Sequence, residues 1–61
     1  MRTREIIRLL EQHGWREVRQ KGSHKQFKHA DFPYVITVAD HPGDMPPGTL
    51  ADILKKAGIK R

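Results

Sequence analysis

The two ends of this chain carry the same helical pattern, which leaves only the middle for β-structure. Apolar residues recur there at the i, i+3, i+4 spacing of one helix face. This spacing predicts helices over residues 3–13 and 47–57, with Gly14 and Gly58 as left-handed stops just beyond them. The residues that share the spacing are Ile6, Leu9, Leu10 and His13 near the N-terminus, and Leu50, Ile53 and Leu54 near the C-terminus.

Polar and proline residues mark the ends of these helices. We expect Thr3 to cap the first helix, and Glu5 in its first turn suits the positive end of the helix dipole. We expect Trp15 to fold back on Leu10, the apolar contact that accompanies a glycine stop. Pro47 suits the first position of the second helix.

Three strand candidates occupy the middle of the chain. They are residues 15–20, 24–29 and 34–38, and the last has the strongest β-propensity in the sequence. Short turns at 22–23 and 30–33 predict an antiparallel meander. The sheet must bury one face, and two helices are available to cover it. The prediction is an α+β fold of order α-β-β-β-α, a three-stranded antiparallel sheet with two helices packed on one face.

Composition limits the class of protein and its partners. Residues 1–61 predict a single domain with a small core, because a chain of this size buries only about 60% of its unfolded surface. The sequence has no cysteine, no apolar run long enough for a membrane span and no signal peptide, so we expect a cytoplasmic protein that does not contact a membrane. A net charge of +5 favours a polyanion or an acidic protein as partner.

Strand alternation places one histidine on the face of the sheet that the helices leave open. Phe27 is the only large apolar residue of the second strand, so it should point towards the helices. His24 is an odd number of residues away and should point to the opposite face, together with Gln26 and Lys28. This holds if the second strand has no bulge.

The stretch from residue 21 to residue 27 is the best candidate for chemistry. An imidazole such as that of His24 accepts or donates a proton near neutral pH. Lys21 and Lys25 beside it could hold a phosphate, Gly22 would let the backbone approach a ligand, and Ser23 can supply a hydrogen bond. The alternative is an ordinary hairpin whose histidine is merely exposed, because Gly-Ser-His is a weak motif by itself.

The remaining histidines give no metal site. We expect His13 to be a partly buried residue at the end of its helix, and His29 and His41 to be solvated near turns. His24 and His29 should face opposite sides of a regular strand and could not share an ion. With no cysteine, we predict no metal and no cofactor. His29, Tyr34 and His41 remain open as a second proton-transfer group.

Taken together, these motifs resemble the HicA family of small prokaryotic toxins, the messenger-RNA interferases of HicA–HicB toxin–antitoxin pairs. The resemblance covers nearly all of the chain. The residues that carry it are Gly14-Trp15, Arg19-Gln20-Lys21-Gly22-Ser23-His24, Phe27-Lys28-His29, and Gly48-Thr49-Leu50 with Ile53-Leu54-Lys55 and Ala57-Gly58.

This resemblance implies a fold similar to double-stranded RNA-binding domains and a ribonuclease activity on mRNA, with His24 as the essential histidine. Lys21, Lys25 and Lys28 would bind phosphates, without a metal ion. It also implies a HicB-like antitoxin that masks the site. Many relatives have a second histidine where this chain has Lys25, and proline where it has Ala39. The first departure bears on any mechanism that needs two adjacent imidazoles.

Two other functions are compatible with the sequence. A non-catalytic RNA-binding module of the same fold would need only the basic face, because RNA can be recognised by shape and backbone. A small adaptor would use that face for a protein partner, and would show no salt-sensitive binding to RNA.

Overall fold

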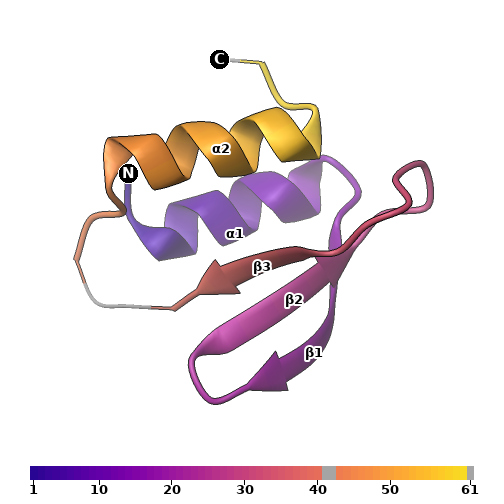
Figure 1. Ribbon diagram of the computed structural model, residues 1–61, viewed down its shortest axis with the longest axis horizontal. Coiled ribbons are helices and arrows are strands. Elements are labelled where there is room, and N and C mark those ends of the chain that lie inside the picture. The colour runs from indigo at the N-terminus through magenta and orange to yellow at the C-terminus, as the bar shows by residue number, and fades with distance from the viewer. Residues whose placement is uncertain (41–42, 61) are drawn as a thin grey trace.

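The computed structural model describes residues 1–40 and 43–60, which form two helices and three strands. In chain order the elements are α1 (Thr3–Gln12), β1 (Arg16–Lys21), β2 (His24–Lys28), β3 (Ile36–Ala39) and α2 (Pro47–Ala57) (Figure 1). The predicted α+β class and the order α-β-β-β-α are therefore confirmed.

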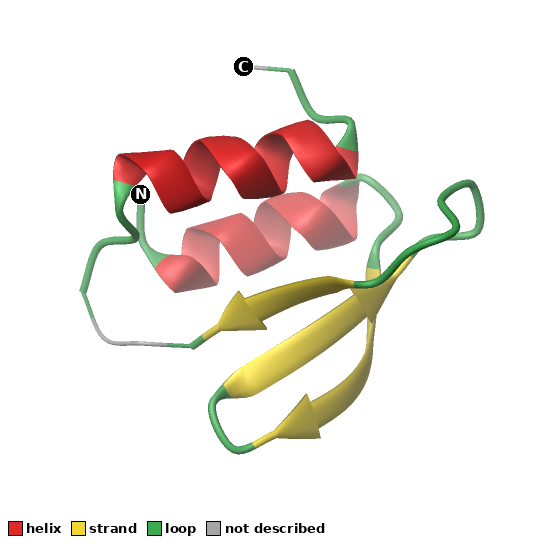
Figure 2. Ribbon diagram, in the orientation of Figure 1, coloured by secondary structure: helices red, strands yellow, loops and turns green. Residues whose placement is uncertain are grey.

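The three strands form one antiparallel sheet in the order β1-β2-β3. Strand β2 lies in the middle, so β1 and β3 are the edges of the sheet. Both helices lie side by side on one face of the sheet (Figure 2). We call this the helix face and its opposite the outer face, over which no other element of the described ranges packs.

The first helix begins at Thr3 itself, whereas a helix capped by Thr3 would begin at the next residue. Arg2 is the N-cap residue, and its backbone N–H donates to Glu5 Oε1 at 2.9 Å. Thr3 is the first helical residue and is buried, so the prediction of Thr3 as the cap is wrong. Glu5 does lie in the first turn, as predicted, and satisfies a backbone donor there.

Both helices end in the same way, as their matching patterns predicted. Gly14 has φ +92° and Gly58 has φ +73°, a left-handed conformation that costs glycine little because it has no Cβ. In each case the residue after the glycine turns back to the last turn of the helix. The closing hydrogen bonds run from Trp15 N–H to Leu10 O at 3.0 Å and from Ile59 N–H to Leu54 O at 2.9 Å.

A small core fills the space between the helices and the sheet. Trp15 connects the end of α1 to the end of α2: it follows Gly14, and its indole Nε1–H donates to the carbonyl of Ala57 at 3.3 Å. A buried indole needs such a partner for its N–H. The largest fully buried side chains are those of Trp15, Phe27, Ile6, Leu10 and Val38.

The third strand begins later than predicted. It spans Ile36–Ala39 instead of 34–38, and Tyr34 and Val35 are both exposed residues of the preceding loop. The hydroxyl of Tyr34 donates to the carbonyl of Lys56 at 2.5 Å, near the end of α2. This contact connects the loop before β3 to the end of α2.

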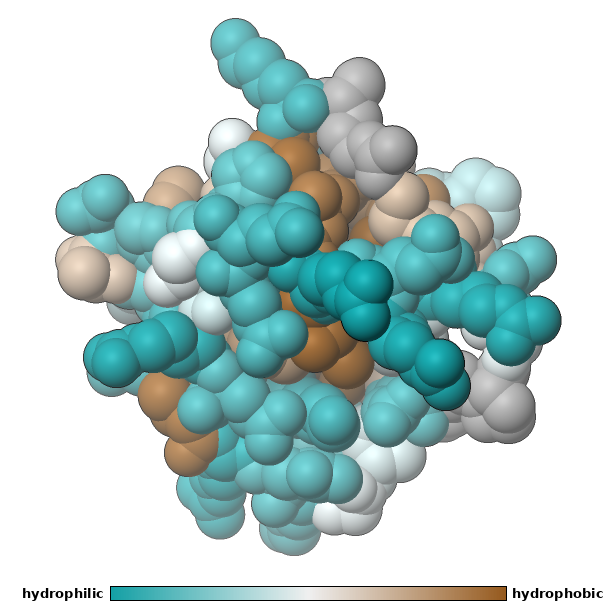
Figure 3. All heavy atoms as spheres, turned by 180° about the vertical axis from the view of Figure 1, so that it is seen from behind, coloured by the Kyte–Doolittle hydropathy of each residue, from teal (hydrophilic) through white to brown (hydrophobic). Residues whose placement is uncertain are grey.

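The face of the molecule opposite the view of Figure 1 is mainly hydrophilic. Figure 3, the view from behind Figure 1, shows a central band of hydrophobic side chains and smaller hydrophobic patches among hydrophilic ones. So small a chain cannot cover all of its apolar surface. Neither α1 nor α2 has the length and apolar character needed to cross a membrane, and no other helix occurs in the described part of the chain.

Candidate functional site

A two-residue turn joins β1 to β2 and sets the position of His24. Lys21 pairs directly with His24, which leaves Gly22 and Ser23 as the turn. Gly22 has φ +61° and Ser23 does not have positive φ, the pattern of the type II′ hairpin, which requires glycine at its first central position. Two hydrogen bonds hold the turn: Gln20 Nε2–H donates to the Gly22 carbonyl at 3.1 Å, and Asp40 N–H donates to the Ser23 carbonyl at 2.6 Å.

Strand pairing places His24 on the outer face. Directly paired residues of neighbouring strands share a face, and successive residues alternate between faces. Phe27 pairs with Ile36, and both are buried on the helix face. His24 pairs with Ala39 and is exposed. This pair is three residues away from the Phe27–Ile36 pair, an odd number, and therefore lies on the outer face. The register of β2 with β3 has no bulge, so the condition on which this prediction depended is met.

A bulge in β1 adds Arg16 to the cations on the face of His24. Glu17 pairs with Phe27 and Arg19 pairs with Gln26, so Val18 is an extra residue without a partner on β2. In a regular strand, Arg16 and Arg19 are three residues apart and would point to opposite faces. The bulge places them on one face. The outer face consists of Arg16, Arg19 and Lys21 of β1, His24, Gln26 and Lys28 of β2, and Thr37 and Ala39 of β3.

The structure places Lys25 on the other side of the sheet. It pairs with Val38 and Gln20, and its Nζ lies 3.6 Å from Glu17 Oε1. It also lines a shallow hollow with residues of α1, among them Arg4, Arg8 and Glu11. Lys25 is thus adjacent to His24 in the chain but lies on the opposite face of the sheet. Of the three predicted phosphate-binding lysines, Lys21 and Lys28 share a face with His24.

His29 has a structural role that the sequence did not indicate. Its Nε2–H donates to the carbonyl of His13 at 2.9 Å, and its Nδ1 accepts from the N–H of Asp31 at 3.0 Å. These partners orient the ring, with Nδ1 as acceptor and Nε2 as donor. The ring also packs 5.2 Å from that of Trp15, and a Cβ on Gly14 would come within 2.8 Å of it. His29 therefore ties the loop after β2 to the end of α1.

The other histidines and Tyr34 either have partners elsewhere or lie outside the described residues. His13, for which partial burial was expected, is exposed, and its Nδ1 lies 2.9 Å from the Leu9 carbonyl. The Tyr34 hydroxyl is bonded to the end of α2. His41 lies outside the described residues. Over residues 1–40 and 43–60, no three His, Asp or Glu side chains gather closely enough to hold a metal ion.

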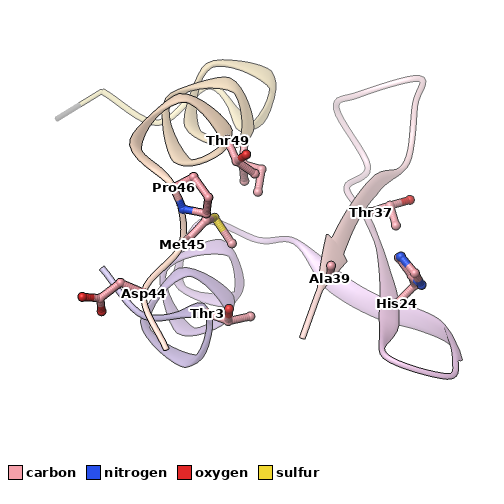
Figure 4. Close-up of a pocket in the computed structure, with 9 residues that line it drawn as sticks. Thr3, His24, Thr37, Ala39, Asp44, Met45, Pro46 and Thr49 are labelled. Carbon is pink, nitrogen blue, oxygen red and sulfur yellow. The ribbon is translucent and has the colours of Figure 1, made fainter. Parts of the chain in front are cut away.

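A hollow of about 330 Å³ adjoins His24 at the free edge of β3. We call it the edge hollow. His24 and Thr37 line it from the outer face, whereas Thr49 and Met45 line it from the helix side (Figure 4). Sequence reasoning missed it, because its walls come from four separate elements and the segment before α2. Its lining residues are Thr3, His24, Thr37, Ala39, Asp44, Met45, Pro46, Thr49 and Ile53.

Comparison with protein families identifies the chain. Residues 3–59 match the family described as HicA toxin of bacterial toxin-antitoxin. This range includes both helices, the whole sheet and His24. A comparison with curated proteins gives no match. Because the family match covers nearly the entire chain, this protein belongs to the HicA toxin family and is the toxin of a toxin–antitoxin system.

Proposed function

We propose that this toxin is a metal-independent endoribonuclease that cleaves mRNA and so blocks translation, with His24 as its catalytic histidine. The observation that carries the proposal is the outer face: His24 is exposed there, directly opposite Lys21. No helix of the described chain covers this face, so a polyanion can reach the imidazole.

The chemistry available to His24 is proton transfer during attack by the ribose 2′-hydroxyl. A neutral imidazole takes the proton of the 2′-hydroxyl as the 2′-oxygen bonds to phosphorus, and the bond to the 5′-oxygen breaks. The leaving 5′-oxygen then needs a proton, which the same imidazolium or water supplies. The products are a 2′,3′-cyclic phosphate and a 5′-hydroxyl, and RNA with a 2′-deoxyribose at the cleaved position is not cut.

The cations of the outer face would bind and orient the RNA backbone. Lys21 and Lys28 share the face of His24, and Arg16 and Arg19 extend the positive surface along β1. These charges would offset the negative charge that develops on the phosphorane. Gly22 and Ser23 would allow a phosphate to approach the turn closely. Lys25 would add to the long-range positive field from the helix face but would not contact the same phosphate.

The ionisable side chains of the outer face argue against a metal ion and favour an acidic antitoxin as partner. On the outer face, only lysine, arginine and histidine side chains are ionisable, a poor set for holding a metal ion. A HicB-like antitoxin with an acidic contact surface would mask this face in the cytoplasm, because opposite charges favour rapid and specific association.

One observation favours a second function, a non-catalytic RNA-binding module. Within the described outer face, His24 is the only histidine, the residue type used most often for proton transfer. A two-group acid–base mechanism would need a partner from elsewhere. A non-catalytic RNA-binding module of the same fold needs no such partner, because its basic face alone would suffice.

One experiment separates the two functions. Cleavage and binding of RNA are measured for the wild type, His24→Ala and the control His13→Ala, with a chelator present throughout. His13 is also an exposed histidine, but it lies at the end of α1. We expect His24→Ala to lose about 10²–10⁴-fold in cleavage while its affinity for RNA changes little, and His13→Ala to cleave normally.

Three results would count against the proposal. Equal cleavage by the wild type and His24→Ala would remove His24 from the mechanism. Loss of wild-type cleavage on adding chelator would overturn metal independence. Binding without cleavage by every protein would favour the RNA-binding module.

A further inference from the structure

The edge hollow is continuous with the proposed site of cleavage. Strand β3 is an edge of the sheet, so a ligand can pass around it from the outer face to the helix side. Figure 4 shows the His24 imidazole and Thr37 on one side of β3, Ala39 at the strand itself, and Thr49 and Met45 on the other. A molecule held at His24 can therefore extend directly into the hollow.

The walls of the hollow suit a neutral, flat and partly polar group. Aliphatic surface comes from Ala39, Met45, Pro46 and Ile53. Threonine hydroxyls, which donate and accept hydrogen bonds, lie on both sides of β3. The Asp44 carboxylate points away from the other lining residues (Figure 4). Met side chains adapt well to the faces of ring systems.

A phosphate group fits the hollow poorly. Among its described lining residues there is no lysine or arginine, whereas the outer face beside it carries four such cations. The charge distribution therefore separates the two parts of a nucleotide. The backbone would lie over β1 and β2, and the base would turn towards β3.

The size of the hollow limits its occupant to one base. Its volume of about 330 Å³ lies at the lower end of the range for ligand pockets, which begins at about 300 Å³. A base inside a duplex is paired and stacked, and cannot enter such a recess. Single-stranded bases can, and proteins commonly read them by apolar contact and by hydrogen bonds to their edges.

We propose that the edge hollow binds one unpaired base of the RNA, the base next to the phosphodiester on which His24 acts. The inference rests on the proposed ribonuclease function and makes it more specific. It assigns Thr37 and Thr49 to the recognition of that base, and it requires the RNA to be single-stranded at the cut.

The test combines a change in the RNA with a change in the protein. Each nucleotide around the cleaved bond is replaced in turn by an abasic ribose. Cleavage is compared for the wild type, Thr49→Phe and Ala51→Phe. Thr49 is exposed and lines the hollow, so a phenyl ring there would occupy it. Ala51 is an exposed residue of the same helix that does not line the hollow, which makes it the matched control. Circular dichroism verifies that each variant folds.

We expect one abasic position, next to the cut, to lower wild-type kcat/KM at least tenfold. On intact RNA, the kcat/KM of Thr49→Phe should be lower than that of the wild type by about the same factor. The abasic replacement should lower the kcat/KM of Thr49→Phe little further. Ala51→Phe should behave like the wild type. Equal cleavage of all abasic substrates by the wild type, or an undiminished abasic effect in Thr49→Phe, would overturn the base pocket while leaving the ribonuclease proposal intact.

Failure of the ribonuclease proposal would look different. If the wild type cleaves no RNA, the pocket is judged by the affinity of an uncleavable 2′-O-methyl oligonucleotide with the same abasic replacements. Weaker binding of one abasic oligonucleotide by the wild type, but not by Thr49→Phe, would support the pocket. Equal affinities would overturn it.

Discussion

The two faces of β2 differ in what they do, although their residues alternate along a single strand. Phe27 on the helix face is fully buried and forms part of the core. His24 and Lys28 on the outer face are exposed, with arginine and lysine side chains of β1 paired beside them. Stability and the proposed chemistry are therefore carried by residues that are neighbours in the strand but have different surroundings. Each should therefore be removable without the other.

The two histidines at the ends of β2 make the same contrast. His24 at the start is exposed on the outer face. His29, just beyond the end, has both ring nitrogens in hydrogen bonds and packs against Trp15. An imidazole whose two nitrogens are already occupied is a poor proton shuttle. Residue type alone does not distinguish a candidate catalytic group from a structural one.

The largest expected effect comes from a pair of substitutions on neighbouring residues. Phe27→Ala removes a fully buried ring, which costs about 3–5 kcal/mol. A chain of this length is stable by roughly 3–9 kcal/mol in total, so this variant should be largely or wholly unfolded at 37 °C. Gln26→Ala, on the outer face, should change stability by about 0.5 kcal/mol or less. Thermal unfolding followed by circular dichroism measures both, and similar losses for the two variants would refute the division of faces.

A smaller effect should follow from His29→Ala. The substitution removes two hydrogen bonds and a ring contact, so we expect a loss of about 1–3 kcal/mol in unfolding free energy. At a temperature where the variant remains folded, its cleavage of RNA should equal that of the wild type. His24→Ala should show the reverse, with stability kept and cleavage lost. Loss of cleavage by a fully folded His29→Ala would place this ring in the chemistry after all.

The smallest effect distinguishes two lysines that are close in sequence. Lys21→Ala should weaken RNA binding severalfold and reduce the salt dependence of log Kd by about 0.7 for a single-stranded ligand, as one phosphate contact is lost. Lys25→Ala should leave the salt dependence nearly unchanged, because Lys25 faces α1 and Glu17. Binding titrations at several salt concentrations measure both slopes. Equal reductions would mean that RNA also contacts the helix side.

Local chemistry made much of the fold predictable. The glycines after both helices, the Gly-Ser turn and the single large apolar residue of β2 each specify their own surroundings within a few positions of the chain. The face of His24 followed from Phe27 by alternation alone. The same alternation places Lys25 on the helix face with Phe27. Its closeness to His24 in the sequence had suggested that the two residues share a phosphate site.

The features that were missed depend on contacts between distant parts of the chain. In the loop just before β3, the hydroxyl of Tyr34 donates to the carbonyl of Lys56, far away in the sequence. The role of His29 depends on the carbonyl of His13. The bulge at Val18 lies among charged residues, where no apolar alternation reveals a change of register. No local pattern encodes these relations.

The bulge in β1 decides which side chains of this strand reach the outer face. Val18 is 52% exposed and has no partner on β2, so its side chain is nearly free to vary. The bulge itself matters more, because regular pairing with Val18 opposite Phe27 would turn Arg16 inward and Glu17 outward. A carboxylate would then lie on the surface where RNA is proposed to bind. In this strand, the position of the register shift matters more than the identity of Val18.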